Sequence, residues 1–481
     1  MKKISKDQQL RLVLILVLGF VLRLYKINNP VADWHSWRQA DTSAVTRNFV
    51  QEGIDLLHPQ FDDLSSVASG KPNPEGYRFV EFPIYNAIST FWVKIIPRVF
   101  TVEIGARFVS VFCSLVSCVL LFLIVKKYLG VRTALASALF FAVLPYNVYY
   151  SRVILPEPMM VMCSLGLIWF FDRWMEEKKW LSGCMAVWFT AVGLLLKPFV
   201  AFLFLPLVYL VLRKLGLKGV FSSSVLLFFC SSVLPFFFWR WWTGHFPEGI
   251  PAYLWLLNQD KIRFKGAWFW WLFAKRLGEL ILGFWGLVPF GLGLILAPNE
   301  KEGWFFHLWF LAILLYFLVF ATGNVRHDYY QIISIPIICV FLAKGVDFLL
   351  FSSQKIFNSV LCSLFSVLCS FFMLAFSWYQ VRTYFWINRP EIVEAGEAVD
   401  QLVPKEAKII APFGGDTAFL YQTKRKGWPV VEAPLDEMHK WGADFLVSVD
   451  PKDEGIRGLK EKYEVLKETE KYIIFDLKKP L

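Results

Sequence analysis

The chain has 481 residues, of which 56% are hydrophobic and 19% carry a charge. The interior of a water-soluble protein of this size cannot hold so many apolar side chains, 48 phenylalanines among them, so the composition excludes an ordinary soluble enzyme and predicts a bilayer protein. The formal net charge of +11 falls partly in short loops between apolar runs, where positive charge is retained on the cytoplasmic side. We therefore expect no nucleic-acid partner.

The apolar runs predict about eleven membrane-spanning helices, each of which needs about 20 residues. The basic amino end "MKKISKDQQLR" precedes the first run without a small-residue cleavage site, so we interpret it as an uncleaved signal anchor with a cytoplasmic N-terminus. An odd number of spans then places the carboxyl end outside. The predicted spans lie near residues 9–27, 104–125, 133–150, 157–172, 180–196, 198–212, 219–239, 278–297, 304–321, 329–343 and 357–378.

Two of the apolar segments admit more than one interpretation. The close pair of spans around Lys197, in "LLLKPFVAF", fits a kinked connection or a re-entrant turn. The segment "PIYNAISTFWVKIIPRVF" at 83–100 fits either another span or an interfacial helix.

The pattern divides the chain into two domains. Residues 1–378 form the predicted transmembrane domain, including a first exterior loop at 28–103 that is longer than a connection requires. Residues 379–481 alternate helical segments ("EIVEAGEAVDQLV", "TAFLYQTKR") with strands ("AKIIAPF", "DFLVSVD", "KYIIFDL"), which predicts a small soluble α/β domain on the exterior side. Its "PFGGDTAF" lacks the glycine spacing of a dinucleotide fingerprint, so we expect no nucleotide site.

The first exterior loop carries two ionisable clusters. In "VADWHSWRQADTSAVTRNFVQEG", helical spacing places Arg38 and Asp41 on one face, one turn apart, and His35 lies nearby. The alternative is a local ion pair between Arg38 and Asp41 on an interfacial helix. "GYRFVEFPIYN" supplies Arg78 and Glu81, for which ordinary turn polarity before a proline is the alternative.

Further ionisable residues lie beside later spans, where charge is expensive and indicates function. "YYSRVILPEPMM" contributes Arg152 and Glu157, although a carboxylate there also suits a helix N-terminus. The long loop at 240–277 carries positive charge, Arg263 included, on the predicted exterior face, which indicates an anionic ligand or contact with lipid headgroups. The remaining candidates are Lys197 and, in "GNVRHDYYQ", Arg326, His327, Asp328 and Tyr330. Such a set could transfer a group from a lipid phosphate, with a carboxylate base and stabilising cations.

Five of these motifs occur in an order that resembles a known family. "WHSWRQADTSAVTRNF", "VEFPIYN", "YYSRVILPEPMMV", "LLLKPFVAF" and "VRHDYYQIISIPIICVFLA" resemble the family 39 and related GT-C glycosyltransferases, which include protein O-mannosyltransferases and the bacterial aminoarabinose transferase acting on lipid A. The resemblance implies a polytopic α-helical membrane protein of the GT-C fold. It also implies a donor that is a polyprenyl-phosphate sugar and an acceptor that is a glycolipid, a polysaccharide or a protein, at the outer face of the inner membrane.

The resemblance also implies roles for individual residues. Asp41 corresponds to the acid of the first exterior loop, the catalytic base of an inverting displacement, although many relatives have an Asp-Glu pair where this chain has Asp41-Thr42. Glu81 and Glu157 would support the acceptor or hold a divalent metal, which we do not expect to be required. The donor phosphate would be held by Lys197, Arg326, His327 and Tyr330.

Two alternatives from other classes stay open from the sequence. One is an O-antigen ligase or polymerase, whose key basic and histidine residues lie far along the chain rather than after the first span. The other is a flippase for lipid-linked sugars, although transporters usually show two similar halves and this chain has no internal repeat.

Overall fold

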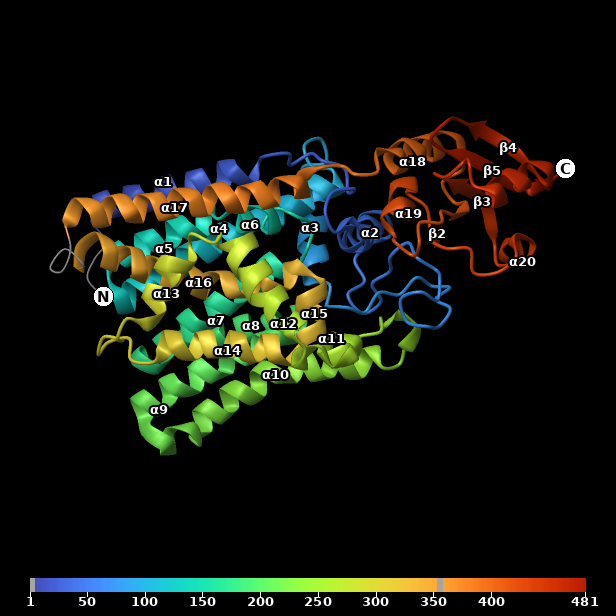
Figure 1. Ribbon diagram of the computed structural model, residues 1–481. Coiled ribbons are helices and arrows are strands. Elements are labelled where there is room, and N and C mark those ends of the chain that lie inside the picture. Colours follow the sequence, from blue (N-terminus) through green and yellow to red (C-terminus); the bar gives the residue numbers. More distant parts are fainter. Residues whose placement is uncertain (1–4, 353–357) are drawn as a thin grey trace. The chain divides into compact units, whose positions relative to one another are not determined.

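The computed structural model describes residues 5–352 and 358–481, which fold into two compact units. We call the first the helical unit; it comprises Met1–Ile27, Phe108–Arg240 and Tyr253–Thr383. The second, the mixed unit, comprises Asn28–Arg107, Trp241–Ala252 and Tyr384–Leu481. Lys2 and Lys3 of the predicted signal anchor lie outside the described residues. Figure 1 labels the helices and strands of both units.

The helical unit is built from helices joined by short connections, and each of the predicted spans contains helical residues. Several helices are interrupted: Leu144 separates α5 from α6, and η4 and η6 are π-helical. In chain order the helices that lie wholly or partly in this unit are α1 (Lys6–Arg23), α4 (Val102–Leu129), α5 (Val131–Val143), α6 (Pro145–Tyr150), α7 (Glu157–Glu177), α8 (Trp180–Leu196), η1 (Pro198–Leu203), α9 (Phe204–Val220), α10 (Ser223–Thr243), α11 (Trp255–Asn258), η3 (Gln259–Phe264), α12 (Gly266–Phe269), η4 (Trp270–Ile281), α13 (Leu287–Ile295), α14 (Phe305–Val319), α15 (Ala321–Arg326), η5 (Asp328–Ser334), α16 (Ile335–Asp347), η6 (Phe348–Ser352) and α17 (Ser359–Val381), followed by η8 (Arg382–Phe385).

Apolar helices of membrane-spanning length confirm a multi-pass membrane architecture. Within the described part of the chain, five helical stretches are long and apolar enough to cross a bilayer: Val102–Leu129, Pro198–Val220, Ser223–Thr243, Asp328–Phe351 and Ser359–Leu402. Three shorter apolar helices accompany them: Val131–Val143, Trp180–Leu196 and Phe305–Val319. The total of about eleven spans stays a prediction.

The connection around Lys197 is a kink. Helix α8 ends at Leu196, and Lys197 adopts an extended backbone with φ −154° and ψ 127°. Pro198 then opens the 3₁₀ turn η1, which suits a residue that has no N–H to donate. This geometry carries the Lys197 side chain out of the helical register at a buried position.

The mixed unit combines helices with a five-stranded sheet (Figure 1). The strand order is β2-β1-β3-β5-β4, with β1 parallel to β2 and β3, and β5 antiparallel to β3 and β4. The helices are α2 (Ser36–Glu52), α3 (Ile84–Ile95), η2 (Pro247–Gly249), α18 (Pro390–Leu402), α19 (Ala418–Thr423), α20 (Leu435–Lys440), α21 (Glu454–Gly458) and η9 (Leu459–Glu461). The strands are β1 (Lys408–Ile410), β2 (Gly427–Trp428), β3 (Ala443–Ser448), β4 (Tyr463–Glu468) and β5 (Ile473–Pro480).

The sheet binds the first loop as well as the carboxyl-terminal segment. Strand β3 pairs Leu446 with Phe475 of β5, and both side chains are fully buried in the sheet's core. Leu64 of the first loop belongs to the same core. An isolated parallel bridge joins Asp63 to Gly427, so the loop extends the sheet beyond β2. The two segments therefore fold as one unit.

Helix α2 is the buried helix of the mixed unit. Every residue from Arg38 to Phe49 is buried, which the predicted interfacial helix does not require. Helix α3 packs against it, with Asn86 Nδ2 donating to the Thr42 carbonyl at 2.7 Å and to Thr46 Oγ1 at 3.0 Å. At 12 residues, α3 is shorter than the roughly 20 that a span needs, so the segment at 83–100 fits the interfacial alternative better.

Candidate functional site

Asp41 lies in the middle of α2 with its side chain 3% exposed. Two groups from distant parts of the mixed unit hold its carboxylate. Arg78 Nη2 donates to Asp41 Oδ2 at 2.5 Å, and Thr417 Oγ1 donates to Asp41 Oδ1 at 2.6 Å. The guanidinium of Arg78 also stacks over the Phe61 ring, 4.9 Å from its centroid. The carboxylate is thus held in one orientation by one charged and one neutral donor.

Arg38 pairs with Glu81 rather than with Asp41. Its Nη2 atom lies 2.6 and 2.7 Å from the two carboxylate oxygens of Glu81, and both side chains are buried. The helical spacing made a local pair of Arg38 with Asp41 plausible. The structure instead has two ion pairs across the first loop, Arg38 with Glu81 and Arg78 with Asp41. Sequence reasoning named all four residues without their partners.

Three further aspartates, Asp62, Asp63 and Asp416, interact electrostatically with Asp41. Burial, together with the negative charge of Asp41, raises the pKa of Asp63 to about 6, although hydrogen bonds from Ser65 oppose that rise. Burial, again with Asp41, raises the pKa of Asp416 to about 6. Burial raises the pKa of Asp62 as well, although the ion pair with Arg47 opposes that rise. The site therefore concentrates negative charge around the candidate base.

His35 marks the start of α2. It is the residue before the helix and has a left-handed backbone with φ 54°. The ring of the preceding Trp34 stacks on Tyr384 with centroids 4.9 Å apart. This packing fixes where α2 begins and, through it, the position of Asp41 two turns later.

Glu157 and Lys197 form a buried ion pair in the helical unit. Glu157 Oε1 lies 3.2 Å from Lys197 Nζ, and the two side chains are 2% and 7% exposed. Glu157 opens α7, whereas Lys197 is the extended residue after α8. Both carboxylate oxygens of Glu157 are buried without a hydrogen-bond donor, so the Glu157–Lys197 pair is held by charge alone.

The segment around residue 328 gathers a second polar group of the helical unit. Asp328 Oδ1 accepts a hydrogen bond from Tyr150 at 2.5 Å, and its Oδ2 lies 3.5 Å from Arg276 Nη1. Arg326 is exposed and stacks over the Trp255 ring, 5.4 Å from its centroid. The aromatic residues next to them include His327 and Tyr330, whose rings lie 6.0 Å apart. Arg276 belongs to the positively charged loop at 240–277, for which the sequence analysis gave no partner at this position.

Two predicted candidates have backbone partners. Arg152 is fully buried, and its Nη1 donates to the Lys26 carbonyl at 2.7 Å. Arg263 Nη2 donates to the carbonyls of Leu257 and Val319 at 3.2 and 3.1 Å. These bonds assign both residues a part in fixing loops of the helical unit.

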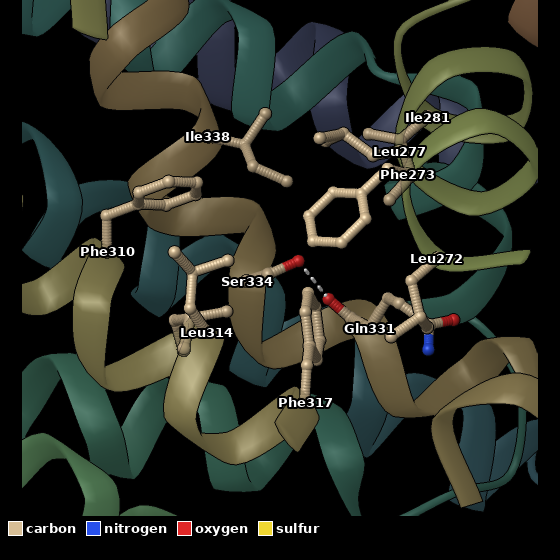
Figure 2. Close-up of a pocket in the computed structure, with 11 residues that line it drawn as sticks. Leu272, Phe273, Leu277, Ile281, Phe310, Leu314, Phe317, Gln331, Ser334 and Ile338 are labelled. Carbon is tan, nitrogen blue, oxygen red and sulfur yellow. Dashed lines mark hydrogen bonds between the residues drawn. The ribbon is translucent and has the colours of Figure 1, made fainter. Parts of the chain in front are cut away.

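An apolar pocket of the helical unit opens between η4, α14 and the η5–α16 segment. Figure 2 shows Phe273, Phe317 and Ile338 among the side chains that line it, with Gln331 and Ser334 as the polar residues. Ser334 Oγ donates to the Gln331 carbonyl at 2.6 Å, which satisfies the hydroxyl inside this apolar lining. The free space inside is about 10 Å³, room for about one water molecule, so these side chains form packed apolar interior.

The carboxylates considered for a divalent metal occur as ion pairs. Glu81 faces Arg38, and Glu157 faces Lys197, in different units. Among the described residues there is no group of three or more His, Cys, Asp or Glu side chains arranged to hold a metal ion.

One comparison with known proteins covers the segment that carries the Glu157–Lys197 ion pair. Residues 83–242 match the model of the family described as dolichyl-phosphate-mannose-protein mannosyltransferase, and this stretch includes Glu157 and Lys197. No curated protein matches the chain by sequence.

Solved structures share the fold over nearly the whole chain. ArnT from Cupriavidus metallidurans bound to undecaprenyl phosphate is similar with a TM-score of 0.66 and 13% identity, covering 97% of each chain. The Archaeoglobus fulgidus oligosaccharyltransferase AglB, in complex with an inhibitory peptide and a dolichol-phosphate, has a TM-score of 0.54 and 10% identity, covering 96% of this chain and 72% of that one. The mycobacterial arabinofuranosyltransferase AftD has a TM-score of 0.58 and 11% identity, covering 97% of this chain and 40% of that one.

Asp41 and the cations of the helical unit lie in different units, and their meeting in one active site stays a prediction. The match of residues 83–242 to a mannosyltransferase family indicates a glycosyltransferase, and the solved structures show that the chain is a multi-pass membrane protein with the fold shared by ArnT, AglB and AftD.

Proposed function

We propose that the protein transfers a sugar from a polyprenyl-phosphate donor to a hydroxyl or amine of an acceptor at the outer face of the cell's inner membrane. The observation that carries this proposal is the match of residues 83–242 to a family whose description names a dolichyl-phosphate sugar. The undecaprenyl phosphate bound to the similar ArnT structure supports the same donor class. In this proposal the amino end is cytoplasmic, and residues 379–481 lie on the exterior side as the carboxyl-terminal domain.

The proposed reaction is a single displacement at the anomeric carbon. The acceptor oxygen or nitrogen forms the new bond to that carbon while the bond from carbon to the phosphate oxygen breaks, and the electron pair leaves with the phosphate. Asp41 takes the proton that the acceptor loses. Attack opposite the leaving phosphate inverts the configuration, and no covalent sugar–enzyme intermediate forms.

Residues of the helical unit would stabilise the phosphate that leaves. We assign Lys197, Arg326, His327 and Tyr330 to this task, because cations and ring N–H or O–H donors match phosphate oxygens. Lys197 is paired with Glu157, so the ion pair would hold its ammonium in place without leaving the charge uncompensated.

The acceptor is assigned only by class. The similar Archaeoglobus fulgidus oligosaccharyltransferase has been solved with a tethered acceptor peptide, whereas the family that the sequence resembles also includes an aminoarabinose transferase acting on lipid A. A panel of glycolipid, polysaccharide and peptide acceptors, each combined with a series of polyprenyl-phosphate sugars, would identify the pair that releases free lipid phosphate.

Replacement of Asp41 by asparagine tests the mechanism. Asparagine keeps the size of the side chain, but its single amide oxygen can replace only one of the two carboxylate oxygens that face Arg78 and Thr417. The amide cannot take the proton of the acceptor. We expect sugar transfer to fall by about 100- to 10,000-fold, the range that loss of a general base produces. The measurement is release of free polyprenyl phosphate by purified protein in detergent.

The matched control is Asp55→Asn in the same loop. Asp55 is exposed, and its carboxylate bonds locally to His58 and Leu57. This variant should transfer sugar at the rate of the unaltered protein. Full activity of Asp41→Asn, with both variants folded, would remove Asp41 from the mechanism.

A further inference from the structure

Thr417 stands beside Asp41, although 376 residues separate the two in the sequence. It follows strand β1 and the turn "PFGGD", immediately before α19, and its side chain is buried. Its hydroxyl lies 2.6 Å from Asp41 Oδ1 and 3.2 Å from the Trp37 carbonyl. A hydroxyl has one proton to donate, and the shorter contact to a charged acceptor is the stronger hydrogen bond.

We propose that Thr417 is a positioning residue for Asp41, so that the carboxyl-terminal segment completes the catalytic site. This inference rests on the proposed function, in which Asp41 is the base. Arg78 holds one carboxylate oxygen and Thr417 the other, and the two donors come from opposite ends of the chain's mixed unit. Together they fix the plane of the carboxylate, which decides where an incoming proton must lie.

The local structure of α19 shows that this contact is not a by-product of helix capping. Thr417 occupies the cap position of α19, where a threonine usually accepts from the helix's first N–H groups. Here its side chain makes no such bond. Asp416 Oδ1 accepts from Ala418 N at 2.7 Å instead. The hydroxyl of Thr417 is therefore turned toward Asp41 and available to it.

Contacts along α19 hold Thr417 in place against α2. The Arg47 guanidinium stacks over the Tyr421 ring at 4.6 Å and donates to the Tyr421 carbonyl at 3.1 Å. Gln422 Nε2 donates to the Val31 carbonyl at 2.9 Å, before the start of α2. Because these bonds join α19 to both ends of the segment that carries Asp41, the Thr417–Asp41 distance is set by the fold rather than by a mobile side chain.

Two substitutions at position 417 separate positioning from packing. Thr417→Val keeps the shape and removes the donor, whereas Thr417→Ser keeps the donor and removes a methyl group. We expect Thr417→Val to lower kcat by on the order of 10-fold, the value of a hydrogen bond to a charged group, with KM for donor and acceptor unchanged. Thr417→Ser should restore most of kcat. Thr423→Val is the matched control, because Thr423 donates only to the Leu420 carbonyl of the same helix.

The pH profile supplies a readout that packing would not move. The ionised form of Asp41 loses a donor in Thr417→Val, so the acidic limb of kcat/KM should move to higher pH. The charged groups that act on Asp41 here are Arg78 and the three aspartates at 62, 63 and 416, and none of these is changed by the substitution. Thr417→Ser and Thr423→Val should keep the original limb.

Each outcome decides the inference. An unchanged kcat and profile in Thr417→Val would overturn it, and so would equal losses in Thr417→Val and Thr417→Ser, which indicate packing. If Thr417→Val does not fold, Thr417→Ala must show the same loss and the same shift, or the inference fails. Full activity of Asp41→Asn would overturn the proposed function and this inference together, whereas an inactive Asp41→Asn beside a fully active Thr417→Val would overturn the positioning role alone.

Discussion

The carboxylates around Asp41 lower the stability of the folded mixed unit. Asp62 and Asp63 are buried and Asp416 is half-buried, and the cations bonded within this group are Arg47 and Arg78. Burial disfavours the charged form of an acid, and like charges add to that effect. A fold selected for stability alone would not collect them, and such clusters are typical of functional sites.

Asp416→Asn should reveal this cost as a pH-dependent gain in stability. Burial and the charge of Asp41 raise the pKa of Asp416 to about 6 in the folded protein, above its ordinary value. For an acid with a raised folded pKa, the stabilising contribution is complete below the unfolded pKa and is lost as pH rises through 6. Asparagine does not ionise and can still accept from Ala418, so the variant should be more stable by about 1–3 kcal/mol at pH 7.5 and nearly equal at pH 4.

Thermal unfolding of the full-length variant in detergent at the two pH values is the measurement. Asp55→Asn is a control in which the stability should change in the opposite direction. Partial burial acts to raise the pKa of Asp55, but hydrogen bonds from His58 and Leu57 outweigh burial and lower this pKa below its ordinary value. That variant should lose stability near neutral pH and regain parity in acid. A gain for Asp416→Asn that is the same at pH 4 and pH 7.5 would contradict the electrostatic explanation.

At the scale of elements, α13 and α16 lie side by side (Figure 1), and glycines stand where the two helices approach each other. A Cβ on Gly345 would lie 1.8 Å from the Pro289 carbonyl oxygen, and a Cβ on Gly293 would lie 1.9 Å from the Phe341 carbonyl oxygen. Backbone atoms cannot give way as a flexible side chain can. The two helices therefore pack at a distance that only glycine permits, as small residues do between membrane helices.

Gly345→Ala should force α13 and α16 apart and destabilise the helical unit by about 1–3 kcal/mol, the usual cost of overpacking. The measurement is the midpoint of thermal unfolding in detergent. Gly291→Ala is the matched control on α13, because no atom lies within 4 Å of its added Cβ. The control should keep or slightly raise the midpoint, since alanine favours helix over glycine. Equal midpoints for the two variants would show that the helices do not approach as described.

Much of this architecture could be predicted from local patterns. Hydropathy located the five described helices that are long and apolar enough to cross a bilayer, and 3.6-residue spacing located α2 and α18. Strands β1, β3 and β5 were predicted from apolar runs, whereas β2 has two residues and β4 has a mostly polar, half-buried pattern, so neither gives a clear signal. Helical spacing favoured a pair between Arg38 and Asp41, but Arg38 finds Glu81 43 residues away. Pairings at such separations, Thr417 with Asp41 above all, depend on the tertiary fold and have no local signature.

At the scale of the whole molecule, the mixed unit is assembled from segments at opposite ends of the chain. Residues 28–107 precede most of the membrane helices, and residues 384–481 follow all of them. Contacts between residues so far apart in the sequence form late in folding. The chain must first lose the entropy of closing a long loop, and only then does the contact stabilise it. The site around Asp41 is therefore completed only when the carboxyl-terminal segment has docked on α2.

Hydrogen exchange of the full-length protein in detergent should show this shared folding. Amides of α2, in the first loop, should lose protection at the same denaturant concentration as those of β3 and β5, because the two segments form one compact unit. Within the helical unit, the amides of α7 and α16 should follow their own transition.

Tyr421→Phe offers a directed perturbation, since it removes the hydroxyl that donates to Glu103 at 2.6 Å and keeps the ring under Arg47. It should lower the protection of α2 and of the sheet together. If α2 instead exchanged in step with α7 and α16 while the sheet kept its own transition, the first loop would fold with the membrane helices, and the carboxyl-terminal segment would be an independent domain.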